Sequence, residues 1–233
     1  MDGNRKYSKS LTFIEDALVA SSRNAIDLVG AAEKLSVENY HAPCLSMSIL
    51  ALEEMGRAFL INDLLFAKST TPKLDHFEKS LKNHNIKLQA VPMVSALWLQ
   101  VAEFDLRYAA QDRFRRALKI GYENWKLAGQ EVLDLAGEQN FAFLDKWKQS
   151  GFYVSLINGN KFQSPRDGVD PAISERVRRF SNLSAKNLDS AFSDGNLKRH
   201  IDKAKIIRSK FSDSDHQLFE TEAEQMIGRL FDS

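Results

Sequence analysis

Two adjacent glutamates and an arginine, Glu53, Glu54 and Arg57, lie inside an otherwise apolar segment over residues 45–66. At about 100° per residue, the apolar side chains of this segment cover most of a helix circumference, which is typical of a central bundle helix. Buried carboxylates need partners, and Arg57 stands at i,i+4 from Glu53 and at i,i+3 from Glu54. The three residues neutralise part of their own charge, and the surplus negative charge predicts a cationic partner elsewhere in the chain.

A histidine and a lysine at i,i+3 spacing, His84 and Lys87, follow in the next expected helix, over residues 74–89. If the two helices form an antiparallel hairpin, a rise of about 1.5 Å per residue places His84 about one turn from the level of Glu54 and Arg57. A glutamate beside a histidine raises the pKa of the imidazole and holds one tautomer, so the ring can act as base or acid near neutral pH. Arg57 and Lys87 supply positive charge for a phosphodiester. These residue types predict proton transfer on a phosphate-bearing substrate.

The same residues have two other interpretations. Helices of a bundle often exchange a buried salt bridge, so the cluster also fits a structural ion network that fixes helix register. Glu53, Glu54 and His84 also offer ligands for a divalent cation, but the sequence lacks the paired Glu-x-x-His segments of di-iron bundles. We therefore predict no metal and no other cofactor, and the catalytic and structural interpretations both stay open.

The elements that must position these residues are helices. Five prolines and eleven glycines in 233 residues, with apolar residues recurring at intervals of three and four, indicate an all-α fold. Helical periodicity lapses near 152–163, where an apolar run followed by Asn-Gly-Asn predicts a short extended segment or hairpin. The expected helices cover about 10–35, 45–66, 74–89, 93–137, 171–191, 196–210 and 214–231. We predict a single domain over 1–233, with a bundle core over about 10–150 and the hairpin and C-terminal helices over about 151–233 packed on it.

Composition and charge exclude several classes of protein. The net charge of +1, from 32 basic and 31 acidic residues, argues against a dedicated nucleic-acid coat protein. The single cysteine, Cys44, excludes an intramolecular disulfide framework and favours a reducing compartment. No segment reaches the roughly 18 apolar residues that span a bilayer, and the polar N-terminus has no apolar segment behind it. We expect a soluble, cytoplasmic protein that does not enter a membrane.

Several short segments resemble the AbiV-type abortive infection family of bacteria. In that family an Asn-Ala start precedes an Ala-x-Glu-Glu-x-Gly-Lys segment on the second helix and a His-x-x-Lys on the third. The resembling segments here are Asn24–Leu28, Ala31–Leu35, Tyr40–Ala42, Ala51–Arg57, His84–Lys87, Ser150–Val154 and Gln163–Pro165, so the resemblance extends over about residues 20–175. Arg57 stands where lysine is usual, which keeps the charge but changes its geometry.

The resemblance implies a HEPN-like helical bundle, because the family is similar to the HEPN superfamily. Many members of that superfamily are dimeric, metal-independent ribonucleases with an Arg-x4-6-His motif. No histidine in this sequence has an arginine five to seven positions before it. The resemblance therefore implies a variant site made by Glu53, Glu54, Arg57, His84 and Lys87. In that site His84 would be the general base toward a ribose 2′-OH, and the cations would face the phosphate.

From the resemblance we predict a protein of anti-phage defence that is an RNA-targeting toxin or ribonuclease activated on infection. The expected partners are RNA, a phage-encoded activator protein and a second copy of the chain in a homodimer. The alternative is a non-enzymatic module that binds a phage or host protein and blocks translation or phage replication by that contact. In the alternative, Glu53, Glu54 and Arg57 form an ion network that fixes helix register.

Overall fold

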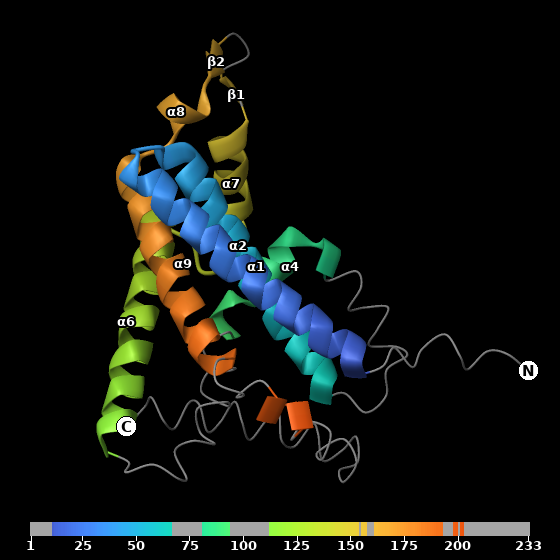
Figure 1. Cartoon of the computed structure of the whole chain (residues 1–233). Coiled ribbons are helices and arrows are strands. Elements are labelled where there is room, and N and C mark those ends of the chain that lie inside the picture. The colour runs from blue at the N-terminus through green and yellow to red at the C-terminus, as the bar shows by residue number, and fades with distance from the viewer. Residues whose placement is uncertain are drawn as a thin grey trace, which may run out of the picture.

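The computed structural model describes residues 11–66, 81–93, 112–153, 155–157, 161–192, 198–199 and 201–202. In this part of the chain, α-helices form a bundle and two short strands form a hairpin at one end (Figure 1). The long helices are α1 (Leu11–Val37), α2 (His41–Phe66), α6 (Asp112–Ala136) and α9 (Pro171–Phe192). The short helices are α4 (His84–Gln89), α7 (Leu144–Phe152) and α8 (Pro165–Gly168), with 3-10 turns η1 (Val91–Met93) and η2 (Phe141–Phe143). The predicted all-α fold is confirmed.

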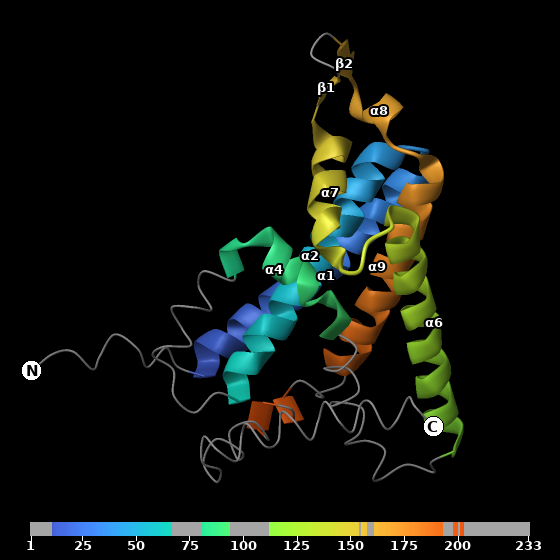
Figure 2. The ribbon, with the colours of Figure 1, turned by 180° about the vertical axis from the view of Figure 1, so that it is seen from behind.

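A tight turn folds α1 and α2 into an antiparallel pair, which the two opposite views show side by side (Figures 1 and 2). Asn39 has φ 58°, a left-handed conformation that asparagine tolerates better than most residues. Tyr40 N donates to Leu35 O at 2.8 Å and closes the end of α1. Pro43 lies in the first turn of α2, where a missing N–H leaves no helical bond unmade.

Helix α2 is the central element, with α1, α4, α7 and α9 packed around it (Figure 2). Its apolar residues recur around the whole helix, as the sequence pattern predicts for a buried helix. The buried apolar side chains of α2 are Ala42, Cys44, Leu45, Ile49, Ala51, Leu52, Met55, Ala58 and Ile61. Glu53 and Glu54 are therefore buried among these side chains, whereas the Arg57 side chain is partly exposed.

Aromatic side chains join α9 to α6 and to η2. Phe180 of α9 stacks on Phe141 with ring centroids 5.0 Å apart, and Trp125 of α6 lies 5.7 Å from the same ring. Trp125 Nε1 donates to Ser184 Oγ at 2.8 Å, so the indole nitrogen is satisfied although the side chain is buried. This packing fixes α9 against α6 and η2, while α4 and α7 pack on α2.

The hairpin predicted near 152–163 is present as β1 (Ser155–Ile157) and β2 (Lys161–Gln163). The strands are antiparallel, with Leu156 opposite Phe162. After β2, Pro165 opens α8 at a position that needs no backbone donor. Among the described residues, no helix combines the length and the apolar composition that crossing a membrane requires.

Four expected helices differ from the structure or lie wholly or partly outside the described residues. The expected helix over 74–89 is interrupted at Asn83, whose backbone is extended and whose side chain caps α4. In the expected helix over 93–137, residues 94–111 lie outside the described residues, and α6 ends before Gly137 at φ 64°. The expected helices over 196–210 and 214–231 lie almost entirely outside the described residues. A helix over 144–152 is absent from the prediction, yet α7 forms there.

Candidate functional site

Glu53, in the middle of α2, is the centre of the site. Its side chain is 2% exposed, and its carboxylate contacts three side chains of two other helices. His84 Nδ1 and Lys87 Nζ, both of α4, lie 2.7 Å and 3.3 Å from Oε2. Lys148 Nζ, of α7, donates to Oε1. Two ammonium groups thus supply the compensation that a buried carboxylate requires.

A second acid, Asp145, completes the cluster from α7. Lys148 Nζ lies 2.7 Å from Asp145 Oδ1 and 3.3 Å from His84 Nδ1. Burial tends to lower the pKa of Lys148, but the hydrogen bonds to Asp145 and Glu53 outweigh burial and the pKa is raised. Burial tends to raise the pKa of Asp145, and its hydrogen bond with Lys148 outweighs that effect, so the pKa is lowered. Both groups are therefore charged at neutral pH.

The charges of the cluster balance without His84. Glu53 and Asp145 contribute two negative charges, and Lys87 and Lys148 contribute two positive charges. The two lysines therefore compensate the two carboxylates without any charge on the imidazole. Because Nδ1 faces a carboxylate oxygen, the tautomer protonated at Nδ1 donates to Glu53 and leaves the lone pair on Nε2.

Gly56 allows α4 to lie directly on α2. A Cβ atom at Gly56 would lie 1.9 Å from the carbonyl oxygen of Lys87, a distance that no side chain can occupy. Gly56 stands three residues after Glu53, on the same side of the helix. The glycine therefore brings the α4 backbone close enough for His84 and Lys87 to reach the buried carboxylate.

Gly151 has the same role between α7 and α2. A Cβ atom there would lie 2.1 Å from Ser46 Oγ and 2.5 Å from the carbonyl oxygen of Ala42. Ser46 Oγ donates to the carbonyl oxygen of Lys148 at 2.8 Å, and Ser46 is fully buried. These contacts fix the backbone of Lys148 and direct its side chain along α2 toward Glu53.

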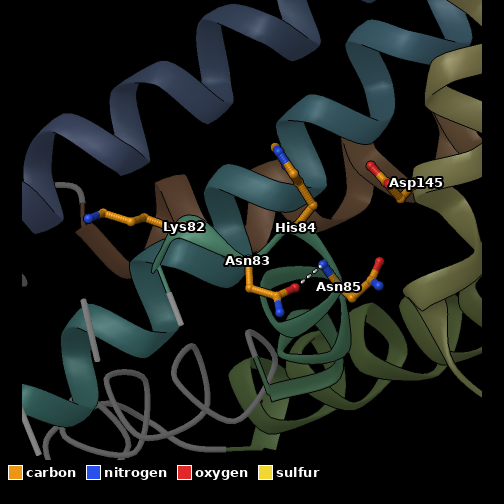
Figure 3. Close-up of a pocket in the computed structure, with 5 residues that line it drawn as sticks. All are labelled: Lys82, Asn83, His84, Asn85 and Asp145. Carbon is orange, nitrogen blue, oxygen red and sulfur yellow. Dashed lines mark hydrogen bonds between the residues drawn. The ribbon is translucent and has the colours of Figure 1, made fainter. Parts of the chain in front are cut away.

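The exposed side of the cluster opens into a pocket. The pocket has a volume of about 390 Å³ and is lined by Lys82, Asn83, His84, Asn85 and Asp145 (Figure 3). Asn83 Oδ1 accepts from the backbone nitrogens of Asn85 and Ile86 at 3.0 Å and 3.3 Å, which fixes the first turn of α4. The His84 side chain is 53% exposed. The imidazole therefore connects a buried carboxylate to an open pocket.

The comparison with family models matches residues 13–186 to HEPN_AbiV, the AbiV family. The match covers 174 of the 233 residues, including every residue of the Glu53 cluster. The chain belongs to the AbiV family of HEPN proteins. Membership of AbiV associates the chain with abortive infection, a form of anti-phage defence. Neither the comparison with curated proteins nor the comparison with solved structures found a match.

In this AbiV protein the five predicted site residues form two groups. Glu53, His84 and Lys87 meet in the cluster described above. Glu54 and Arg57 instead pair with each other, with Nη1 3.1 Å from Oε2. Among the described residues, no hydrogen bond or ion pair connects this pair to the Glu53 cluster. The sequence allows Arg57 to pair with Glu53 at i,i+4 or with Glu54 at i,i+3, and the structure has the pair with Glu54. Lysines of α4 and α7 pair with Glu53 instead.

Two residues of the site were absent from the prediction, namely Asp145 and Lys148. They stand at i,i+3 on α7 and form an ion pair within that helix. The sequence does contain a signal for this pair. Asp145 and Lys148 have the Asp-x-x-Lys spacing of a helical ion pair, and Gly151 follows Lys148 within one helical turn. The signal becomes specific only when α7 packs on α2, because Lys148 and Glu53 are 95 residues apart.

One set of side chains has the composition of a metal site. Glu53, His84 and Asp145 each offer a ligand atom, and these atoms lie within 4.8 Å of one another. The sequence suggested Glu54 as the third ligand, but the structure brings Asp145 to this position instead. Lys148 Nζ contacts all three groups, so an ammonium group of the chain lies where the ligand atoms converge.

Proposed function

We propose that this AbiV protein is a toxin that cleaves RNA without a metal ion. The observation that carries the proposal is the position of His84, whose Nδ1 is 2.7 Å from the buried Glu53 carboxylate and whose ring is half exposed in the pocket. A histidine oriented by a buried acid and open to solvent is the arrangement that general base catalysis requires. The ion pair of Asp145 with Lys148 adds fixed charge beside it.

The proposed reaction is attack of a ribose 2′ oxygen on the adjacent phosphorus. Nε2 of His84 accepts the proton of the 2′-OH as the bond from the 2′ oxygen to phosphorus forms. The bond from phosphorus to the 5′ oxygen breaks, and the leaving oxygen takes a proton from water. The products are a 2′,3′-cyclic phosphate and a 5′-OH end. Glu53 stabilises the imidazolium that forms, because its carboxylate lies against Nδ1.

The lysines have different parts in this proposal. Lys82 is exposed and lines the pocket, so its ammonium group can face the phosphodiester directly. The Lys87 side chain is 3% exposed, and it pairs with Glu53 rather than contacting substrate. The sequence assigned the phosphate to Arg57 and Lys87, and the geometry favours Lys82 for this role.

The experiment compares the wild-type chain with His84→Ala and, as a matched control, His41→Ala. The control removes the partly buried imidazole of His41, which has no described contact with the Glu53 cluster. We expect His84→Ala to lose about 10²- to 10⁴-fold of the RNA cleavage rate, the usual contribution of a general base. His41→Ala should cleave at the wild-type rate. Mapping of the RNA ends should show cyclic phosphates, and an RNA with 2′-deoxyribose at the cut site should resist cleavage.

The result that would overturn the proposal is wild-type cleavage by a folded His84→Ala protein. Phage protection by wild type and His84→Ala alike, without RNA cleavage by either, would instead support the non-enzymatic interaction module. Because RNA is the substrate, the proposal includes action in the cytoplasm. It also includes a homodimer, tested by light scattering, and a phage-encoded activator protein, tested by co-purification from infected cells.

A further inference from the structure

Three ligand-type atoms surround the ammonium group of Lys148. Nζ lies 2.7 Å from Asp145 Oδ1 and 3.3 Å from His84 Nδ1, and it donates to Glu53 Oε1. Two carboxylates and an imidazole are a ligand set that zinc and manganese accept in proteins. In this site the same set surrounds a lysine.

We propose that Lys148 is a tethered cation that occupies the centre of a latent divalent-metal site. Zinc binds nitrogen and oxygen ligands at about 2.0–2.2 Å, whereas a charged hydrogen bond is about 2.7–2.9 Å long. Glu53, His84 and Asp145 offer ligand atoms within 4.8 Å of one another, so a small inward movement of their side chains would adapt them to a metal ion. The ammonium group supplies positive charge at the position that a metal would take.

The charges of the site explain why lysine excludes a metal. Glu53 and Asp145 carry two negative charges, which Lys87 and Lys148 balance. A divalent ion added to this set would leave a net charge of +2 in a buried region, which is strongly unfavourable. Removing the Lys148 ammonium leaves a net charge of −1 and three convergent ligands. The same site should then attract a divalent cation.

Two backbone contacts with α2 fix the part of α7 that carries Lys148. Ser46 Oγ donates to the carbonyl oxygen of Lys148 at 2.8 Å, and Gly151 packs within one turn against Ala42. The packing of α7 on α2 therefore fixes the position of Lys148. Its ammonium group occupies the centre of the site whether or not metal ions are available. The exclusion of metal by Lys148 is a property of the cluster alone and is the same whatever substrate the protein takes.

The test uses Lys148→Ala, Lys148→His and the control Lys148→Arg in the full-length chain, with zinc chloride and manganese chloride as probes. Calorimetric titration and thermal unfolding with and without each ion measure binding. We expect Lys148→Ala to bind at least one ion about tenfold or more tightly than wild type and to unfold at a higher temperature with it. Lys148→His adds a fourth zinc ligand and should bind zinc more tightly than Lys148→Ala. Lys148→Arg keeps a cation and should bind like wild type.

A double variant, Glu53→Gln with Lys148→Ala, separates this site from adventitious binding. It should lose the added affinity, because a central ligand is gone. The proposal is overturned if neither Lys148→Ala nor Lys148→His binds zinc or manganese more tightly than wild type, including in refolding with the ion present. It is also overturned if the double variant binds as tightly as Lys148→Ala. None of these measurements uses RNA, so a negative result here leaves the proposed ribonuclease activity to its own test.

Discussion

Two polar clusters in the described part of the chain join helices, and they differ in whether one of their side chains reaches a pocket. In the first, α2, α4 and α7 meet around Glu53, which is 2% exposed. In the second, α1 and α9 meet around Arg178, which donates to Glu33 and, through Nε, to Glu175 Oε2 at 2.8 Å. The side chains of Glu33 and Glu175 are 36% and 54% exposed. Both clusters hold the bundle together, but only the first buries its acid.

In the second cluster the cation, Arg178, uses its hydrogen-bond donors on carboxylates of the cluster. The planar guanidinium of Arg178 divides its donors between two carboxylates, and Asn182 Nδ2 donates to Glu33 Oε1 at 2.5 Å. In the first cluster one partner of the acid is an imidazole that reaches a pocket. Ion pairing between helices therefore does not by itself identify a functional site. What distinguishes the Glu53 cluster is a titratable ring between a buried acid and open space.

The largest expected effect comes from removing Glu53, and removing Glu33 from the second cluster is the matched comparison. Glu53→Ala removes the carboxylate partner of buried Lys87 and one of the two carboxylate partners of Lys148, and it should lower the free energy of unfolding by about 3–5 kcal/mol. Glu33→Ala removes a partly exposed acid and should cost about 1 kcal/mol or less. Urea unfolding of both variants measures the difference. Equal losses would show that the two clusters are energetically alike and would remove the distinction.

The next effect comes from the glycine that brings α4 onto α2. Gly56→Ala places a methyl group against the backbone of Lys87 and should destabilise the chain by about 1–3 kcal/mol through overpacking. Gly30 in α1 is the matched control, because a Cβ there meets nothing within 4 Å. Gly30→Ala should stabilise the chain by about 0.5–1 kcal/mol, since alanine favours a helix interior. Thermal and urea unfolding check both signs, and a stabilising Gly56→Ala would contradict the close packing.

The sequence predicted the chemistry of the buried acid better than its partners. A surplus negative charge in an apolar helix requires a cation, and helical spacing brings His84 and Lys87 within reach of α2. Spacing does not decide which glutamate faces them, because neighbouring residues point about 100° apart and Arg57 suits both. The packing of α4 and α7 decides, and Glu53 faces both helices.

The sequence analysis did not predict α7, because few residues near it in the sequence indicate a buried helix there. Nine residues give little more than two turns of periodicity, and the segment contains two lysines and an aspartate. Lys148 is buried only because Gly151 and Ser46 bring α7 onto α2. By contrast, α2 and the hairpin carry their signals in consecutive residues, and both were predicted. The sequence pattern alone did not predict contacts between residues far apart in the chain, such as that of Lys148 with Glu53.

The pH dependence of stability should separate the two clusters on the alkaline side. The pKa of Asp145 is lowered, so its contribution is present above its ordinary pKa of about 3.9 and is lost as the pH falls through the lower folded value. The pKa of Glu175 is lowered by Arg178, so the second cluster also loses stability in acid. The pKa of Lys148 is raised, so its contribution is present below about 10.4 and is lost as the pH rises through the higher folded value. Arginine does not deprotonate in this range.

Lys148→Arg tests this difference. The variant should flatten the alkaline loss of stability, measured as the urea midpoint from pH 9 to about pH 11, because its cation keeps its proton. Asp145→Asn should instead reduce the acid-side loss. An alkaline profile that is the same in wild type and Lys148→Arg would contradict the assignment of that loss to the first cluster.

The smallest expected effect on stability comes from the outermost member of each cluster. His84 is half exposed and the charges around Glu53 balance without it, so His84→Ala should change the free energy of unfolding by about 0.5 kcal/mol or less. Asn182→Ala removes a hydrogen bond to Glu33 and should cost about 1 kcal/mol. Of these two variants, only His84→Ala should slow RNA cleavage under the proposed function, by about 10²- to 10⁴-fold. A loss of several kcal/mol in His84→Ala would make the imidazole a structural partner, and the two clusters would then differ in burial alone.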